Sequence, residues 1–287
     1  MKTLDLTNVF SRPVADCTAM EVAAALGRGF EGYVVPLRFT PEASERRFRA
    51  EDLDPYASRV YERDGEPAGV VLIARRGWTS RVAAMGLAPE LRGGGVGRWI
   101  LEDVIAEARE RGERTMVLEV VEGNAPAEGL YAKLGFRPLR RLVGYQWEPP
   151  VAAAPDALEE IDPRDLARVA AREGEPDLPW MLAPETLSAA TMPVRAFRLG
   201  GHAYALAADP GVERMTLSAL VVPRRRRRRG WGSRLLRGLS AAFPGRPWAI
   251  PPVVPEELAP GFFDRLGWER QPLRQIEMVL DLTAPVP

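Results

Sequence analysis

Apolar residues recur at helical spacing in the segment that follows a glycine-rich stretch near residue 95. Val96, Ile100, Val104 and Ala108 lie four residues apart, joined by Leu101 and Ile105, and the charged residues Glu102, Asp103, Glu107, Arg109 and Glu110 are expected to lie outward. A stripe of this kind is typical of a helix that packs one face on a sheet. The pattern therefore predicts an amphipathic helix over about 95–112.

The same reading of hydrophobic periodicity predicts alternating strands and helices along the whole chain. In the first half we expect strands near 3–8, 57–63, 67–76, 79–87, 115–122 and 139–147, and helices near 15–29, 41–49 and 125–135. In the second half we expect helices near 162–173, 184–190, 230–243 and 255–266, and strands near 194–199, 202–208, 213–222, 247–251 and 274–282. The second series repeats the order of the first, which predicts two similar domains.

Proline and small residues separate the two series. The stretch Pro149–Pro155 has the composition of a linker rather than of a core element. We therefore expect an N-terminal domain over 1–148, a linker over 149–157 and a C-terminal domain over 158–287. Each domain is predicted to be α+β, with a mixed, mostly antiparallel sheet flanked by helices.

A glycine-rich loop joins the strand near 79–87 to the amphipathic helix. It reads Arg92-Gly-Gly-Gly-Val-Gly-Arg98. Glycines let an anion approach the backbone, and the helix that follows directs its unpaired N–H groups at the same place. The chain has no Gly-Lys pair for a P-loop, and the spacing does not fit the dinucleotide pattern G-x-G-x-x-G. The loop predicts a pyrophosphate site of another kind.

Composition narrows the class of protein. Apolar residues make up 46% and charged residues 27% of the 287 positions, and the formal net charge is zero. These values predict a globular enzyme whose main partner is neither nucleic acid nor membrane. Cys17 and His202 are the only residues of their types, which argues against a disulfide framework, a metal site and a histidine-based triad. The amino terminus lacks a signal-peptide pattern, so we expect a cytoplasmic protein.

The loop and its surroundings resemble the GNAT superfamily of N-acetyltransferases. Arg92, Gly95 and Gly97 occupy the fixed positions of that family's acyl-coenzyme A loop, R-x-x-G-x-G. Farther on, Asn124 and Tyr131 match the family's next strand and helix, together with Ala127 and Leu134-Gly-Phe136. The resemblance implies acetyl-CoA as co-substrate and direct attack of a primary amine, most simply a small molecule, on the thioester.

The resemblance also implies which residues hold the donor. Backbone N–H groups of Met85, Gly86 and Leu87 would contact the pantetheine arm and the thioester carbonyl. The full set of expected donor-binding residues is Met85, Gly86, Leu87, Arg92, Gly93, Gly94, Gly95, Val96, Gly97, Arg98, Asn124 and Tyr131. Tyr131 matches the family's general acid beside the thiol sulfur, and the alternative is a core aromatic with a satisfied hydroxyl.

The sequence allows more than one role for two acidic residues and one asparagine. Glu119 lies mid-strand, where it is either a general base with a raised pKa or the partner of a nearby arginine. Glu122 at the strand end, or ordered water, is an alternative base. Asn124 either binds the cofactor or caps the helix after it.

The second domain repeats the loop with changes. Arg227, Gly230 and Gly232 match the pattern and form a possible second cofactor site, with one extra residue between Pro223 and Gly230. Phe263 stands where Tyr131 stands in the first domain, and Glu256 replaces the asparagine. We expect a degenerate copy in a monomer with pseudo-dimeric domains, or in a weak homodimer.

The sequence leaves three questions open. The arginines of Arg224–Arg229 either contact a phosphate or lie in a solvated loop, and the alternative is that they bind nucleic acid. Phe30, Tyr33 and Phe39, with Glu31, either line an acceptor pocket or belong to the core. The alternative to an enzyme is a non-catalytic acyl-CoA sensor or scaffold.

Overall fold

The computed structural model describes residues 6–35, 39–150, 157–208 and 214–284. The chain divides into two compact units. Unit 1 comprises Met1–Leu139 together with Glu277–Pro287, and unit 2 comprises Arg140–Ile276. Most of the predicted linker, residues 151–156, lies outside the described residues.

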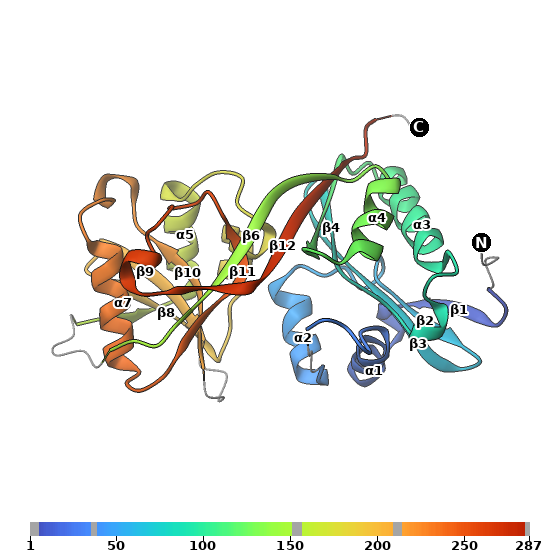
Figure 1. Ribbon diagram of the computed structural model, residues 1–287, viewed down its shortest axis with the longest axis horizontal. Helices are drawn as coiled ribbons and strands as arrows, with labels where there is room; N and C mark the ends of the chain where they lie inside the picture. The colour runs from blue at the N-terminus through green and yellow to red at the C-terminus, as the bar shows by residue number, and fades with distance from the viewer. Residues whose placement is uncertain (1–5, 36–38, 151–156, 209–213, 285–287) are drawn as a thin grey trace. The chain divides into compact units, whose positions relative to one another are not determined.

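Unit 1 alternates strands and helices much as the hydrophobic pattern predicts. Its elements are β1 (Val9–Pro13), α1 (Ala19–Gly29), α2 (Pro41–Ala50), β2 (Arg59–Arg63), β3 (Glu66–Arg76), β4 (Thr79–Leu87), α3 (Val96–Glu110), β5 (Thr115–Val121) and α4 (Ala125–Lys133). Helices α1 and α2 lie on one side of the strands, and α3 and α4 lie on the other (Figure 1). Residues 3–5 of the predicted strand at 3–8 lie outside the described residues, and residues 6–8 do not form a strand, because the first described strand begins at Val9.

Local sequence explains where the helices of unit 1 begin and which faces they bury. Thr18 and Glu21 form a reciprocal capping box at the start of α1. Thr40 caps α2, and Pro41 follows it at the first helical position. Helix α3 buries the stripe that the sequence predicts, with Val96, Ile100, Leu101, Val104, Ile105 and Ala108 all buried.

The sheet of unit 1 has the strand order β1-β2-β3-β4-β5, followed by the end of β12 (Glu269–Asp281). Strands β1 to β4 pair antiparallel with their neighbours, whereas β4 and β5 pair parallel because α3 crosses over between them. The predicted mixed, mostly antiparallel sheet is confirmed.

Unit 2 repeats this plan with its own elements. They are β6 (Arg137–Trp147, which begins in unit 1), β7 (Glu159–Ile161), α5 (Pro163–Glu173), α6 (Pro184–Ser188), β8 (Val194–Leu199), β9 (Ala203–Ala208), β10 (Met215–Val221), α7 (Trp231–Ala242), β11 (Trp248–Pro255) and the first part of β12. Strands β10 and β11 pair parallel, and β8, β9 and β10 pair antiparallel.

The sheet of unit 2 carries one apolar cluster on each face. Alternate residues such as Phe197 and Ala205 pack with Leu235 of α7. Their neighbours Ala196 and Leu206 pack with Leu166 and other residues of α5 and α6. This period of two buries both faces of the strands, which explains why they are apolar along nearly their whole length.

Two predictions about the second half need correction. No helix forms over 255–266 in the described chain, because β11 continues to Pro255 and only a 3₁₀ turn at Asp264–Leu266 follows. Pro260 and the positive φ of Gly261 (66°) break the helical pattern there. The unit boundaries also differ from the predicted 1–148 and 158–287, since Arg140–Glu148 belong to unit 2 and Glu277–Pro287 to unit 1.

Candidate active site

Strands β4 and β5 separate at the centre of unit 1. Their parallel register runs from Thr79 opposite Thr115 to Val82 opposite Leu118. The pairing of β4 with β3 shifts at the next residue, Ala83, and continues to Leu87. A bulge of this kind bends the strand and increases its twist. The carboxyl half of β4, which contains Met85, Gly86 and Leu87, therefore diverges from β5.

The glycine loop lies between β4 and α3. Gly93 and Gly95 have positive φ values of 74° and 89°, and Gly95 is the residue before the helix. A Cβ atom added at Gly93 or Gly94 would meet nothing within 4 Å. No side chain caps α3, so its first N–H groups stay available at this open surface. The loop thus has the shape of an anion cradle.

The side chain of Arg92 faces the protein rather than the open side of the loop. Its Nε donates to the carbonyl of Leu87 at 2.7 Å, and its Nη2 donates to the carbonyls of Gly29 and Glu31 at 3.2 and 2.7 Å. These bonds tie the loop to the end of β4 and to the end of α1. In this structure Arg92 therefore supports the loop, while Arg98 is exposed and pairs with Glu102 at 2.7 Å.

Gly86 allows the end of α1 to approach β4. A Cβ atom on Gly86 would lie 2.8 Å from the carbonyl carbon and oxygen of Gly29 and 2.9 Å from the ring of Phe30. Only glycine fits at so close a backbone contact. Gly97 is also enclosed, since its Cβ would lie 3.3 Å from Met85 Cε and 3.4 Å from Leu130 Cδ2. Gly97 thus brings α3, β4 and α4 together.

Tyr131 lies on α4 and is 9% exposed. Its ring makes an edge contact with Phe136, with the ring centroids 5.9 Å apart. Burial raises the pKa of its hydroxyl well above the ordinary value of 10.0, and the neighbouring Tyr33 raises it further. The hydroxyl therefore holds its proton throughout the neutral range, as a general acid requires.

Asn124 does not cap α4 with its side chain. It instead forms a side-chain hydrogen bond with Tyr33, whose pKa is nevertheless raised because burial outweighs that bond. The helix-capping alternative for Asn124 is therefore wrong. Tyr33 belongs to an aromatic cluster in which Phe30 lies 5.2 Å from Tyr33 and 5.6 Å from Phe39 between ring centroids.

Glu119 pairs with an arginine that the sequence analysis did not single out. The Nε of Arg81 donates to both carboxylate oxygens of Glu119 at 3.1 and 2.9 Å, and its Nη1 donates to Glu51 at 2.7 Å. Arg47 binds the other side of Glu51 at 2.5 Å and donates to the carbonyl of Ala83 at 2.9 Å. Of the two alternatives for Glu119, the structure shows the ion pair with an arginine. In the sequence, the charged Arg81 within an otherwise apolar strand could have indicated this partner.

The loop of unit 2 has the same length as that of unit 1. Each arginine follows a 3₁₀ turn, Pro89–Leu91 or Arg224–Arg226, and precedes a positive-φ glycine at the helix start by three residues. Arg227 Nε donates to the carbonyl of Val222 at 3.0 Å, five residues back, as Arg92 does to Leu87. Pro223 is therefore the counterpart of Ala88, and no extra residue is inserted.

The two replaced residues of unit 2 have structural partners. Phe263 packs in the core, with its ring centroid 4.7 Å from that of Tyr145 and 5.5 Å from that of Trp268. Glu256 pairs with Arg270 at 2.5 Å and with Arg141 at 3.3 Å. Neither places a proton donor where Tyr131 stands in unit 1.

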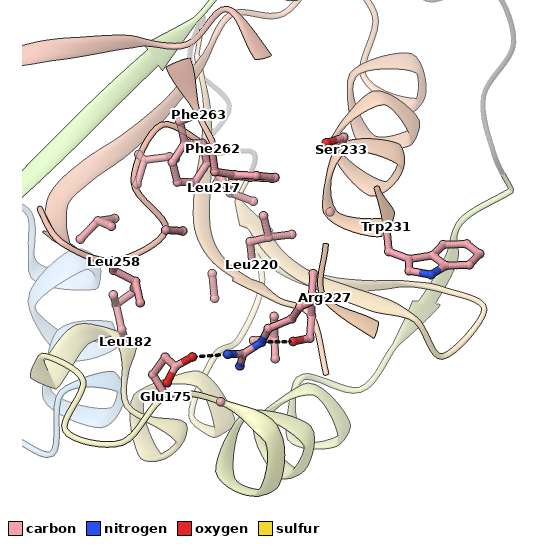
Figure 2. A pocket seen from close by; sticks show the side chains of 18 of the residues that line it. Glu175, Leu182, Leu217, Leu220, Arg227, Trp231, Ser233, Leu258, Phe262 and Phe263 are labelled. Atoms are coloured by element: carbon pink, nitrogen blue, oxygen red, sulfur yellow. Dashed lines mark hydrogen bonds and ion pairs between the residues drawn. The ribbon is translucent and has the colours of Figure 1, made fainter. Parts of the chain in front are cut away.

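A cavity of about 590 Å³ lies within unit 2 beside this loop. Figure 2 shows Arg227 at one side, held by Glu175, with Leu217, Leu220, Phe262 and Phe263 around the interior. The pairing of β10 with β11 covers only Met215 and Thr216 on β10, so these strands also diverge early. The arginine run is partly engaged by the protein itself, because Arg224 donates to the carbonyl of Gly174 at 3.0 Å.

A strand pair that splits beside a glycine loop occurs in each unit, and in unit 1 a buried tyrosine lies on the helix beside it. Residues 30–136 match the family model described as the acetyltransferase (GNAT) family. The chain is 33% identical over 102 residues to a putative ribosomal protein bS18-alanine N-acetyltransferase from Bacillus subtilis, covering 35% of this chain and 68% of that protein. The chain belongs to the GNAT acetyltransferase family.

A second relative is streptothricin acetyltransferase from Streptomyces lavendulae, 35% identical over 88 residues. The match covers 30% of this chain and 47% of that protein, so the chain spans about half the length of this relative.

Solved structures match the fold over nearly the whole chain. A GCN5-related N-acetyltransferase from Sphaerobacter thermophilus has a TM-score of 0.71 at 17% identity and covers 97% of both chains. A tandem GNAT protein from the clavulanic acid biosynthesis pathway has a TM-score of 0.68 at 17% identity, covering 96% of this chain and 99% of that chain. The predicted tandem GNAT architecture is thereby confirmed. Within the described residues, no helix is long and apolar enough to cross a membrane.

Proposed function

We propose that unit 1 is an N-acetyltransferase that moves an acetyl group from acetyl-CoA to a primary amine. The observation that carries this proposal is the position of a buried, protonated tyrosine, Tyr131, on the helix that packs through Leu130 against Gly97 of the glycine loop. The loop would hold the donor's pyrophosphate, and the diverging end of β4 would receive the pantetheine arm.

Most of the proposed donor-binding residues fall into three groups. Gly93, Gly94 and Gly95 leave open space for the phosphates, and the N–H groups of Val96, Gly97 and Arg98 begin the helix behind them. Arg92 and Gly86 act indirectly, because one anchors the loop to backbone carbonyls and the other admits the end of α1. Met85 and Leu87 present the diverging backbone to the thioester.

The proposed reaction is direct attack. The amine nitrogen bonds to the thioester carbonyl carbon, the C–S bond breaks, and the Tyr131 hydroxyl gives its proton to the departing thiolate. A positioned acid typically contributes about 10² to 10⁴ in rate. A backbone N–H aimed at the developing oxyanion is worth about 3 to 4 kcal/mol in other acyl-transfer sites.

The acceptor is proposed to lie beside Tyr33. Phe30 and Phe39 pack against that ring, and Phe30 would lie 2.9 Å from a Cβ on Gly86 at the diverging strand. Aromatic faces attract the cationic form of an amine. Because Glu119 is already paired with Arg81, water or Glu122 is the better candidate to take the amine proton.

The test is a thiol-release assay with acetyl-CoA and a panel of small amines, amino acids and peptide amino termini. We expect turnover on at least one class, and a loss of about 10²-fold or more in Tyr131→Phe. Coenzyme A binding by calorimetry without turnover on any amine would instead favour a non-catalytic acyl-CoA sensor. Failure to bind coenzyme A would overturn both readings.

A further inference from the structure

We infer that the cavity of unit 2 is a binding site for a phosphate-type anion that carries an apolar chain, and that it holds this ligand without transferring any group. The site lies wholly within unit 2. It does not depend on the acetyltransferase activity proposed for unit 1.

The interior of the cavity is apolar. Its volume of about 590 Å³ falls within the range of small-molecule sites. The wall combines residues of the diverging strands β10 and β11 with leucines from the segments around α5 and α6. The aliphatic and aromatic lining includes Leu178, Leu182, Leu187, Leu217, Leu220, Ile250, Val254, Leu258, Phe262 and Phe263. An alkyl or acyl chain fits such a wall better than an amine does.

The lining of the cavity also carries positive charge. Arg226, Arg227 and Arg228 line it from the glycine loop, and Arg265 lines it from the segment of Phe262 and Phe263. Arg227 is held in place by Glu175 and by the carbonyls of Val222 and Glu173. Arg226 and Arg228 are exposed, and no ion pair joins either of them to another described residue. Two uncompensated guanidinium groups beside an apolar space are complementary to an anionic head with an apolar tail.

Loop geometry supports this use of Arg228. Its φ is +59°, in the left-handed region where the corresponding residue of unit 1 is Gly93. Arginine adopts that conformation only at a cost, so the backbone does not explain why this residue stands here. An anion contact by its side chain gives a reason.

The lining lacks the tyrosine to which unit 1's proposed chemistry is assigned, and it lacks an unpaired carboxylate. Phe263 replaces the tyrosine, and Glu175 is the only carboxylate among the lining residues. Glu175 is already paired with Arg227. An amine in this cavity would find no free carboxylate to act as base and no tyrosine to protonate a thiolate. The expected behaviour is therefore binding without turnover.

Two sources share this ligand chemistry. One is a coenzyme A thioester with a medium or long acyl chain, and the other is an alkyl phosphate of the lipid type. Their common features are a phosphate group and an apolar chain, and the test below separates them.

The experiment measures binding to the full-length protein by calorimetry. The probes are octyl phosphate, inorganic phosphate, octanoyl-CoA and coenzyme A. We expect octyl phosphate or octanoyl-CoA to bind at least tenfold more tightly than the matching probe without the chain. If octanoyl-CoA alone shows the chain effect, the ligand is a thioester, and if octyl phosphate alone shows it, the ligand is an alkyl phosphate.

Variants assign that effect to this cavity. Arg226→Gln combined with Arg228→Gln should weaken the chain-dependent binding about tenfold or more. Arg225→Gln combined with Arg229→Gln lies in the same run but outside the lining, and should change it less than twofold. Leu220→Trp should block it by filling the interior, with a thermal unfolding curve to show that the variant folds.

Two results would overturn the inference. One is equal affinity for probes with and without the chain. The other is chain-dependent binding that ignores both the arginine pair and Leu220→Trp. Amine turnover, measured on the same variants, should stay unchanged. A loss of turnover in Tyr131→Phe with intact chain binding would separate the two units' roles.

Discussion

Arg81 and Glu119 face each other across the parallel strands β4 and β5, joined by two hydrogen bonds from the same Nε atom. Their side chains are 7% and 8% exposed. The pair lies next to Val82 and Leu118, the last paired residues before the strands diverge. Through Glu51 and Arg47 it also reaches the carbonyl of Ala83, where β4 bulges. A buried ionic network therefore fixes the point at which the proposed donor site opens.

This arrangement predicts that Glu119 is chiefly structural. In Glu119→Gln the buried Arg81 guanidinium loses one of its two carboxylate partners and keeps only Glu51. The free energy of unfolding should therefore fall by about 3 kcal/mol. Chemical denaturation measures this change. Glu102→Gln is the matched control, because its pair with Arg98 is exposed and its removal should cost less than about 0.5 kcal/mol. If Glu119→Gln kept its stability but lost turnover, Glu119 would instead be the general base.

The same network predicts that the free energy of unfolding decreases at acidic pH. Burial alone would raise the pKa of Glu51, but the charges and hydrogen bonds of Arg47 and Arg81 outweigh it and hold the pKa below the ordinary 4.5. The stabilisation is therefore complete at neutral pH and is lost as the pH falls from about 4.5 through the lower folded value. Denaturation curves across this range should show a shallower acid limb in Glu51→Gln. An unchanged limb would contradict the role given to Glu51.

Tyr131 is predicted to act on the rate and not on binding. Tyr131→Phe should lower kcat by about 10²-fold or more and leave the affinity for coenzyme A within a factor of two. Because the pKa of Tyr131 is raised above 10.0, loss of its proton should not limit the rate below that pH. Tyr61→Phe is the control, since Tyr61 is also a buried tyrosine of unit 1. Similar losses in both variants would point to a packing effect.

Two glycines near the proposed donor site should respond differently to alanine. Gly86→Ala forces a Cβ to 2.8 Å from the backbone of Gly29, and should destabilise unit 1 by about 1 to 3 kcal/mol. Gly94→Ala has open space and no positive φ, so the fold should keep its stability while coenzyme A binds more weakly. Thermal unfolding and calorimetry separate the two effects. An unchanged affinity of Gly94→Ala for coenzyme A would show that this loop does not bind the phosphates.

Tyr33 and Asn124 should be coupled in acceptor binding. Tyr33→Phe and Asn124→Ala each remove the hydrogen bond between them, so the double variant should raise the KM for the amine little more than either single variant. Steady-state kinetics with a saturating donor measures this. Fully additive effects would mean that the two residues act separately.

The hydrophobic pattern predicted most of the fold because burial repeats with the period of the element. Strand β4 and helix α3 appear within about two residues of their predicted limits. The prediction failed where the pattern of residues 255–266 looked helical, because Pro260 and Gly261 leave only a 3₁₀ turn there. It also missed the unit boundary within β6, since contacts distant in sequence decide to which compact unit a strand residue belongs.

The candidate site divides in the same way. The family, the glycine loop, the repeat and the difference between Tyr131 and Phe263 can all be predicted from the sequence, because they depend on residue types at fixed local spacing. Three contacts became known from the folded structure alone: Glu119 pairs with Arg81, Arg92 donates to backbone carbonyls, and Asn124 bonds to Tyr33. Each of these contacts joins separate elements of the fold. Side-chain partners of this kind are set by how strands and helices pack in space, which local spacing does not encode.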